Sequence, residues 1–272
     1  MKDLHGKVAV ITGGASGIGK AIAVQCRDAG MVVVIADIEA AALDATAAEL
    51  GVHGVQTDVT DPASVQSLAD RVVADHGTCH VLFNNAGVGG GGSFVELTLK
   101  DWKWVIDVDL WGVIYVLHSF LPMIRANEAG GHIVNTASIA GLGPFVNAPY
   151  TAAKYAVVGI SETLRTELAG SNVGVSVLCP GFVRTNIYKS QRNRPEELRN
   201  ETKKVAARTE NRETLAAMDA LATDPADLAT EVLRAIQADE FWIITHPETF
   251  AQAMPRYDEL RAIAGGYPPQ LS

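Results

Sequence analysis

The stretch that decides the fold lies near the start of the chain, where residues 7–19 read KVAVITGGASGIG. The apolar run at 8–12 is typical of a buried strand, and the periodic stretch at 18–29 predicts a helix. The turn between them contains Gly13, Ser16, Gly17, Ile18 and Gly19. Glycines let the backbone approach a pyrophosphate, and a helix N-terminus faces the anion. The pattern predicts dinucleotide binding, with a purely structural turn as the alternative.

Short apolar runs alternate with helix-like segments along most of the chain. Predicted strands cover residues 8–12, 32–36, 54–57, 80–84, 131–137, 173–178 and 241–245. Predicted helices cover residues 18–29, 40–50, 62–75, 99–125, 150–169 and 225–238. This alternation predicts an α/β fold, a doubly wound parallel sheet of about seven strands with helices on both faces. We expect the ligand at the carboxyl ends of the strands.

Length and charge narrow the class of protein. A chain of 272 residues, 48% of them hydrophobic, suits a single domain over residues 1–272. The net charge of −9 disfavours nucleic acid and anionic membranes as partners. We see no apolar run of the length of a membrane span and no room for a signal peptide before the first strand, so we expect a cytoplasmic protein.

Cysteine and histidine usage gives two further expectations. Cys26, Cys79 and Cys179 are odd in number and far apart, which suggests reduced thiols. Cys179 adjoins a motif, but a small buried role suits it better than that of a nucleophile. The seven histidines show no ligand spacing, so no metal site is expected.

An acid follows the second predicted strand. Asp37 comes directly after residues 32–36, about twenty residues beyond the glycine turn. An acid at this place accepts hydrogen bonds from the ribose hydroxyls of a dinucleotide and repels a 2′-phosphate. No cation stands beside it in the sequence, since Ile38 follows. The pattern predicts NAD rather than NADP; Asp37 can also cap the helix that begins near Ala40.

Tyr150 and Lys154 are four residues apart within PYTAAK at 149–154. On a helix this spacing puts the phenol and the ammonium on one face, one turn apart. A free tyrosine has a pKa near ~10, and a fixed positive charge beside it lowers that pKa. Tyr150 is therefore a candidate for proton transfer to or from a hydroxyl or carbonyl oxygen. Taken alone, the motif also fits a surface pair without chemistry.

Five motifs occur together in the chain. They are Thr12-Gly13-x-x-x-Gly17-x-Gly19, Asn84-Asn85-Ala86-Gly87, Ser138, Tyr150-x-x-x-Lys154 and Pro180-Gly181. Their order and intervals resemble those of the short-chain dehydrogenases/reductases that prefer NAD, over residues 4–245. The resemblance implies a Rossmann-type fold, NAD as cofactor, and the activity of an alcohol dehydrogenase or carbonyl reductase.

The resemblance also implies cofactor contacts beyond the glycine turn. In the family, the acid at Asp58 meets the adenine amino group, Val59 gives a backbone contact, and Asn85 touches the cofactor. The cap of the helix that begins at 62 is better assigned to Thr60 or Asp61. The remaining implied contacts are Ala86, Gly87, Tyr150, Lys154, Pro180, Gly181, Val183 and Thr185.

Ser138 and Asp109 complete the predicted catalytic set. The Ser138 hydroxyl can hydrogen-bond the reacting oxygen, although a serine at a strand end is often only a turn residue. Asp109, in VDLWG at 108–112, departs from the asparagine usual in the family, which holds a water linking the lysine to solvent. Its charge favours the Lys154 cation and opposes a tyrosinate, so we expect a proton relay with a raised kinetic pKa. The alternative is a tolerated substitution without mechanistic weight.

The expected substrate pocket is mainly apolar or aromatic, which favours a hydrophobic secondary alcohol or ketone. Its predicted residues are Phe94, Leu142, Phe145, Val146, Phe182, Ile187 and Tyr188. A polar insert at 186–222 predicts a mobile helical lid over this pocket, or else a solvated helix without a substrate role. Its cations Lys189, Arg192 and Arg194 either meet an acidic substrate group or form a solvated face.

The long apolar helices at 99–125 and 150–169 pair subunits in the family, so the resemblance implies a homotetramer.

Two other functions stay open. One is a non-catalytic NAD-binding sensor or scaffold on the same fold, favoured only by Asp109. The other is an epimerase or dehydratase with the same tyrosine and lysine, which usually has a larger sugar-binding domain.

Overall fold

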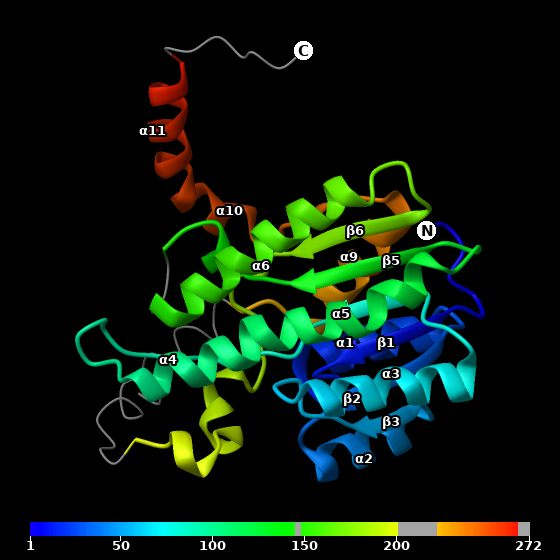
Figure 1. Ribbon diagram of the computed structural model, residues 1–272. Helices are drawn as coiled ribbons and strands as arrows, with labels where there is room; N and C mark the ends of the chain where they lie inside the picture. Colours follow the sequence, from blue (N-terminus) through cyan, green and yellow to red (C-terminus); the bar gives the residue numbers. More distant parts are fainter. Residues whose placement is uncertain (145–147, 201–221, 266–272) are drawn as a thin grey trace.

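The computed structural model describes residues 1–144, 148–200 and 222–265 (Figure 1). Seven parallel strands form one sheet in the order β3-β2-β1-β4-β5-β6-β7. They are β1 (Val8–Thr12), β2 (Val32–Asp37), β3 (His53–Gln56), β4 (Val81–Asn84), β5 (Gly131–Thr136), β6 (Val173–Leu178) and β7 (Trp242–Ile243). The predicted doubly wound sheet is confirmed, and only β7 is much shorter than expected.

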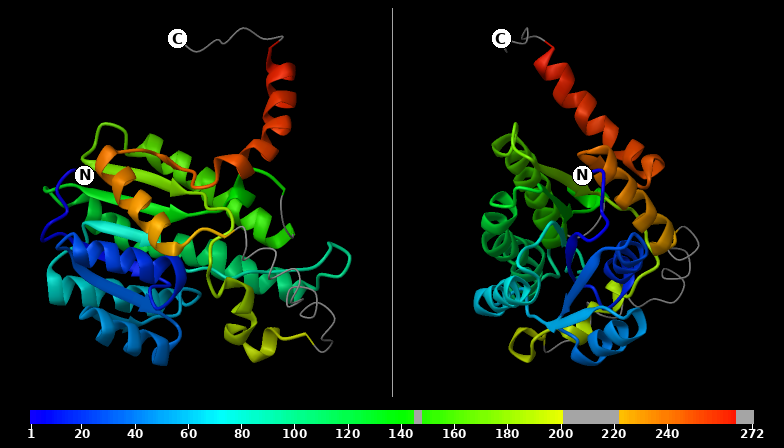
Figure 2. Two further views of the ribbon diagram at one scale, coloured as in Figure 1. Left: turned by 180° about the vertical axis from the view of Figure 1, so that it is seen from behind. Right: turned by 90° about the vertical axis from the view of Figure 1, so that its right-hand side faces the viewer.

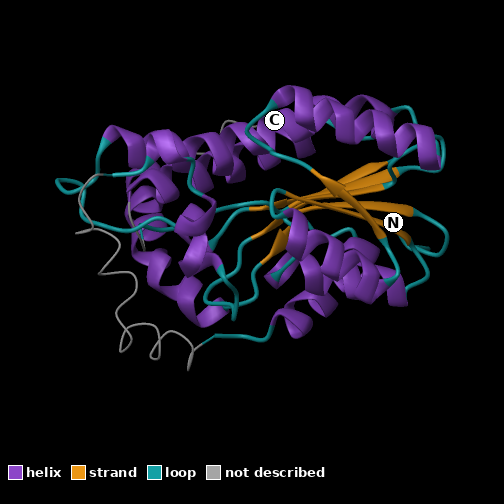
Figure 3. Cartoon of the chain, turned by 90° about the horizontal axis from the view of Figure 1, so that it is seen from below, coloured by secondary structure: helices purple, strands orange, loops and turns teal. Residues whose placement is uncertain are grey.

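Helices cover both faces of this sheet (Figure 3). They are α1 (Gly17–Asp28), α2 (Ala40–Leu50), α3 (Pro62–His76), α4 (Leu99–Ile106), α5 (Gly112–Arg125), α6 (Ala148–Glu167) and α9 (Pro225–Ala238). One apolar core joins the sheet to α1, α2 and α9, and a second joins it to α3, α5 and α6. Every residue of β1 is buried because both of its faces are covered.

A π-helical turn, η1 (Asp107–Trp111), interrupts the helix predicted at 99–125. Nothing in the sequence pattern indicated it. By length and composition, the described run Leu99–Arg125 could cross a membrane, which our reading of the sequence did not anticipate. Val116, Phe120 and Ile124 of this run are fully buried against the sheet, so it acts as a core helix of the domain.

Two C-terminal helices were not predicted. The chain continues past β7 into α10 (Pro247–Phe250), a 3-10 turn at Ala251–Ala253, and α11 (Met254–Ala264). Figures 1 and 2 show α11 projecting away from the body of the domain, and none of its residues is buried. The short α10 instead returns to the carboxyl edge of the sheet, where it reaches the site described below.

Replacing Phe120 with alanine tests the core under α5. Phe120 is fully buried, so Phe120→Ala should lower the free energy of unfolding by roughly 3–5 kcal/mol, measured by urea unfolding. The matched control is Val73→Ala on α3, where the valine side chain is exposed. A loss below about 1 kcal/mol in Phe120→Ala would contradict the assigned packing.

Candidate functional site

Hydrogen bonds join the ends of the neighbouring strands β1 and β4 at the carboxyl edge of the sheet, where the strand order reverses. The Thr12 hydroxyl accepts hydrogen bonds from the backbone N–H groups of Asn85 and Ala86, at 2.9 and 3.0 Å. The Asn85 side-chain amide donates back to the Thr12 carbonyl at 3.0 Å. The Asn85 side chain thus links the ends of β1 and β4. Asn85 also lines the cleft described next.

A cleft of about 200 Å³ runs along this edge over β1, β2 and β3. The predicted cofactor residues that line it are Gly13, Ser16, Gly17, Ile18, Asp37, Asp58, Val59, Asn85, Ala86, Gly87 and Thr185. The structure thus brings together residues from the ends of several strands. Gly19 lies inside α1 and does not reach the cleft. The other predicted cofactor residues line the neighbouring cavity instead, namely Tyr150, Lys154, Pro180, Gly181 and Val183.

The glycine turn leaves no room for side chains. Gly13 and Gly17 have φ angles of +65° and +54°, which favour glycine. A Cβ on Gly17 would lie 3.0 Å from the Thr185 side chain, and one on Gly19 would lie 2.2 Å from the Gly13 carbonyl oxygen. Ser16 makes no side-chain capping bond, so the first N–H groups of α1 stay available to an anion. The turn therefore fits the pyrophosphate of a dinucleotide.

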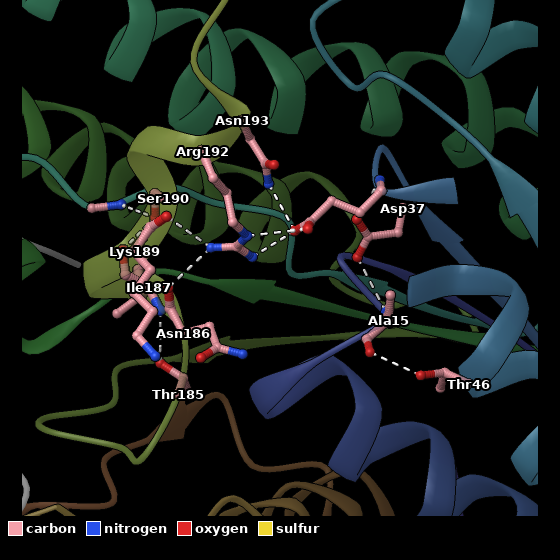
Figure 4. A network of polar contacts seen from close by, with 12 residues as sticks. Ala15, Asp37, Thr46, Thr185, Asn186, Ile187, Lys189, Ser190, Arg192 and Asn193 are labelled. Atoms are coloured by element: carbon pink, nitrogen blue, oxygen red, sulfur yellow. Dashed lines mark hydrogen bonds and ion pairs between the residues drawn. The ribbon is translucent and has the colours of Figure 1, made fainter. Parts of the chain in front are cut away.

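Asp37 lies between the glycine turn and α2. Its carboxylate accepts the backbone N–H groups of Ala15 and Glu39, each at 3.1 Å (Figure 4). Burial raises the pKa of Asp37, and these two hydrogen bonds oppose that rise. The N-cap of α2 is Glu39, so the expectation that Asp37 caps this helix is wrong. Asp37 instead orders the turn before α2 and lines the cleft.

Asp58 is held in the cleft wall by its own turn. Its carboxylate accepts the backbone N–H of Thr60 at 2.8 Å and the Thr60 hydroxyl at 2.7 Å. The cap of α3 is Asp61, which accepts the N–H of Ala63 at 2.9 Å. Of the two residues considered for this cap, Asp61 is the one that the structure uses.

The predicted catalytic residues lie together beyond the end of β5. The Lys154 ammonium donates to the carbonyl of Thr136 at 3.2 Å and lies 5.4 Å from the centre of the Tyr150 ring. Ser138 caps the 3-10 turn η2 (Ile139–Gly141) through its hydroxyl, which accepts the N–H of Ala140 at 3.1 Å. Ser138 also hydrogen-bonds the Tyr150 phenol.

The shift at Tyr150 corrects the expectation drawn from its lysine neighbour. Burial raises the pKa of Tyr150 above the ordinary tyrosine value, the charge of Asp109 raises it further, and the bond with Ser138 lowers it. The sequence predicted that Lys154 lowers the pKa of Tyr150, but the effect of burial is larger and the pKa is raised. The ammonium lies over the ring and 4.0 Å from the Asp109 carboxylate, so an opposite charge offsets its field at the phenol.

Asp109 is fully buried in the π-helical turn η1. One carboxylate oxygen accepts the N–H of Val88 at 2.7 Å. The other lies 4.0 Å from Lys154 and has no hydrogen-bond partner among the residues described. Burial raises the pKa of Asp109 to about 6, against the opposing effects of Lys154 and Val88. A π turn in the middle of a helix is frequent at functional sites, and this one carries the buried acid.

A second, larger cavity of about 520 Å³ opens beside the catalytic residues. Its predicted members are Ser138, Tyr150, Lys154, Pro180, Gly181, Phe182, Val183, Ile187 and Tyr188. Asn85, Gly87 and Thr185 line both hollows, so the cleft and the cavity meet next to the catalytic cluster.

Two predicted pocket residues do not line this cavity. The Phe94 side chain is 69% exposed and packs edge-on against Trp102, because its loop carries it outward. Leu142 is buried in the core with α6. Phe145 and Val146 lie outside the described residues.

The C-terminal segment supplies site residues that the sequence did not reveal. His246, Glu248, Thr249 and Gln252 line the cavity from the start of α10 onward. The buried His246 ring accepts the N–H of Gly181 at 3.0 Å and lies 2.8 Å from the Thr223 hydroxyl. No spacing signal links these residues to Tyr150, since they come from the other end of the chain.

The described part of the predicted lid insert forms two 3-10 turns, η3 (Ile187–Asn193) and η4 (Glu196–Leu198). The rest of that insert, residues 201–221, lies outside the described residues. Arg192 and Arg194 do not line the substrate cavity, and only Arg192 is exposed. Arg194 is buried against Asp101, and Arg192 pairs with Glu39 at the cofactor cleft. The sequence showed no cation beside Asp37, but Arg192 lines the same cleft, from a position about 150 residues further along the chain.

Comparison with known proteins gives concordant matches. The sequence model of the family described as short chain dehydrogenase matches residues 7–196. A short-chain dehydrogenase/reductase structure from Burkholderia phymatum in complex with NAD is 41% identical, with a TM-score of 0.91 and full coverage of both chains. A C alpha-dehydrogenase from Sphingobium sp. is 34% identical, over 91% of this chain and 83% of its own. The meso-2,3-butanediol dehydrogenase of Serratia marcescens is 37% identical, over 81% and 88%.

The raised pKa of Asp109 predicts how stability changes with pH. Its folded pKa of about 6 exceeds the ordinary 3.8, so its stabilising contribution is complete below pH 3.8 and is lost as pH rises through 6. The side chain in Asp109→Asn cannot ionise. As the pH rises from 4 to 8, the free energy of unfolding of this variant should therefore increase relative to that of the wild type, by up to roughly 3 kcal/mol. Thermal and urea unfolding at both pH values measure this gain. Asp107→Asn, in the same turn but partly exposed, is the control; an equal gain there would contradict the assignment.

Proposed function

Because the chain belongs to the short-chain dehydrogenase family, we propose that it is an NAD-dependent oxidoreductase that interconverts a hydrophobic secondary alcohol, cyclic or aryl, and its ketone. The observation that carries this proposal is the position of the catalytic cluster. Ser138, Tyr150 and Lys154 line a largely apolar cavity that joins the cofactor cleft.

Several features of the cleft support NAD as the cofactor. The glycine turn and the N-terminus of α1 suit the pyrophosphate, and Asp37 suits a ribose that bears free hydroxyls. The Burkholderia phymatum relative is in complex with NAD. When bound, NAD supplies the acceptor for the hydride of the alcohol. Lys154, Val183 and Thr185 line the cavity next to the cleft and are positioned to hold the nicotinamide end.

The side chains of the cluster divide the handling of the proton. Tyr150 accepts the proton of the alcohol hydroxyl during oxidation and returns it during reduction. Ser138 hydrogen-bonds Tyr150 and can donate to the same substrate oxygen. Lys154 places a positive charge beside the phenol, and the Asp109 carboxylate, 4.0 Å from the ammonium, partly offsets that charge. Asp109 is then the acid that sets the working pH of the reaction.

The cavity lining supports an apolar substrate. Phe182, Ile187 and Tyr188 present aromatic and aliphatic surface, and the polar lining combines the catalytic cluster with residues from α10 and the turn after it. The butanediol dehydrogenase relative is named for a secondary alcohol. We also infer a cytoplasmic homotetramer; Trp111 on η1 is 46% exposed and stacks on Tyr115, as expected of a face that subunits cover.

Turnover with a panel of hydrophobic secondary alcohols and NAD⁺ tests the proposed function. The near-ultraviolet absorbance of the reduced cofactor should rise, and Tyr150→Phe should lower kcat by roughly 10²–10⁴-fold because the proton acceptor is lost. Cofactor binding should survive this change. Tyr155→Phe, at the next tyrosine on α6 and outside the cavity, is the matched control. Tight NAD binding without turnover in either direction would favour the sensor alternative.

The pH profile of the same reaction tests the role of Asp109. Removing the carboxylate in Asp109→Asn should lower the kinetic pKa of alcohol oxidation by roughly one unit, since an adjacent negative charge no longer opposes the tyrosinate. Oxidation below that pKa should therefore become faster. An unchanged rate and profile would show that the acid is a tolerated substitution.

A further inference from the structure

The cofactor cleft is covered from one side by residues 186–200, which we call the cover segment. Asn186, Ile187, Ser190, Arg192 and Asn193 of this segment line the cleft together with Asp37 and Glu39 on the opposite wall. Figure 4 shows Arg192 and Asn193 facing the Asp37 side of the cleft. The two walls come from parts of the chain separated by about 150 residues, so their contact closes the cleft over its adenosine end.

The two walls are joined by three hydrogen bonds to the carboxylate of Glu39. Glu39 accepts Arg192 Nε at 3.1 Å and Nη2 at 2.5 Å, in a bidentate arrangement. The side-chain amide of Asn193 donates to the same carboxylate at 2.9 Å. Arg192 Nη1 also donates to the carbonyls of Asn186 and Lys189, which orients the guanidinium within its own turn. These bonds fix the guanidinium in the orientation that its bidentate contact with Glu39 requires.

The C-terminal end of the cover segment, residues 194–200, is held differently. Arg194 pairs with Asp101 at 2.6 Å, and both side chains are less than 10% exposed. Asn200 donates to the same carboxylate at 2.9 Å, and the Arg194 guanidinium lies over the Trp104 ring. This end is a buried attachment to α4. The Glu39–Arg192 pair, by contrast, is 30–39% exposed, so water and salt can compete for it.

We propose that Glu39, Arg192 and Asn193 form a releasable clamp that retains the bound dinucleotide, with the cover segment fixed to α4 by Arg194. The clamp closes over the cofactor after it enters and opens before it leaves. Glu39 also engages the guanidinium nearest to Asp37, which keeps that cation from a 2′-phosphate. Glu39 and Arg192 are thus positioning residues for the cofactor. The proposal rests on the proposed binding of NAD and not on any alcohol substrate.

The rate at which NADH leaves the protein tests the clamp. In stopped-flow fluorescence without substrate, Glu39→Gln and Arg192→Gln should each speed NADH release by about three- to tenfold. The double variant should release NADH no faster than either single variant, because the two residues act as one unit. Raising the salt concentration should speed release from the wild type and have little effect on Arg192→Gln.

Two further variants separate the clamp from general damage to the fold. Arg234→Gln breaks two exposed ion pairs, with Glu231 on α9 and with Glu240 beyond it, away from the cleft, and should leave NADH release unchanged. The charge exchange Glu39→Arg with Arg192→Glu should recover part of the slow release. If both single variants release NADH at the wild-type rate, or if their effects simply add, the clamp is refuted. An additive result would mean that Glu39 touches the cofactor directly.

These outcomes are distinguishable from a failure of the proposed function. NADH binding without turnover on any alcohol leaves the clamp fully testable. A wild-type protein that does not bind NADH would instead remove the premise on which the clamp and the dehydrogenase both rest.

Discussion

Two hydrogen bonds to a single hydroxyl hold the site in place. Thr12 ends β1, and its hydroxyl accepts the first two backbone N–H groups beyond β4. On one side of this joint, the glycine turn follows Thr12 directly and Asp37 ends β2. On the other side, Ser138 follows β5 and Lys154 lies on α6. Any loosening here would separate the cofactor cleft from the catalytic cavity, because the two hollows meet at Asn85 and Gly87.

Charge is distributed unequally between the two halves of the site. In the catalytic half, Asp109 and Lys154 are both buried and only 4.0 Å apart. The charge of Lys154 opposes the rise in the pKa of Asp109, and the charge of Asp109 adds to the rise in the pKa of Tyr150. In the cofactor half, Glu39 and Arg192 are partly exposed and make their contact through hydrogen bonds that water can replace. A buried pair suits a fixed proton path, and an exposed pair suits a contact that must open.

The sequence predicted the parts of the fold that depend on local pattern. The β1 strand, the glycine turn and α1 follow from apolar period and backbone freedom, and Tyr150 and Lys154 share a face because a helix has 3.6 residues per turn. It did not predict η1, since a π turn has no local signature here. The contact of Arg192 with Glu39 and the entry of His246 into the cavity were also missed, because long-range packing alone creates them. Phe94 was misplaced for the same reason: its exposure depends on how its loop leaves the sheet.

The central claim is that an NAD site spans the joint between β1 and β4, with Asp37 selecting the cofactor. Competitive binding of NADH and NADPH to the wild-type protein, followed by nucleotide fluorescence, tests it most directly. NADH should bind at least about tenfold more tightly than NADPH, since a 2′-phosphate would lie against the carboxylates of Asp37 and Glu39. Equal or tighter binding of NADPH would contradict it and would mean that Arg192 serves the phosphate.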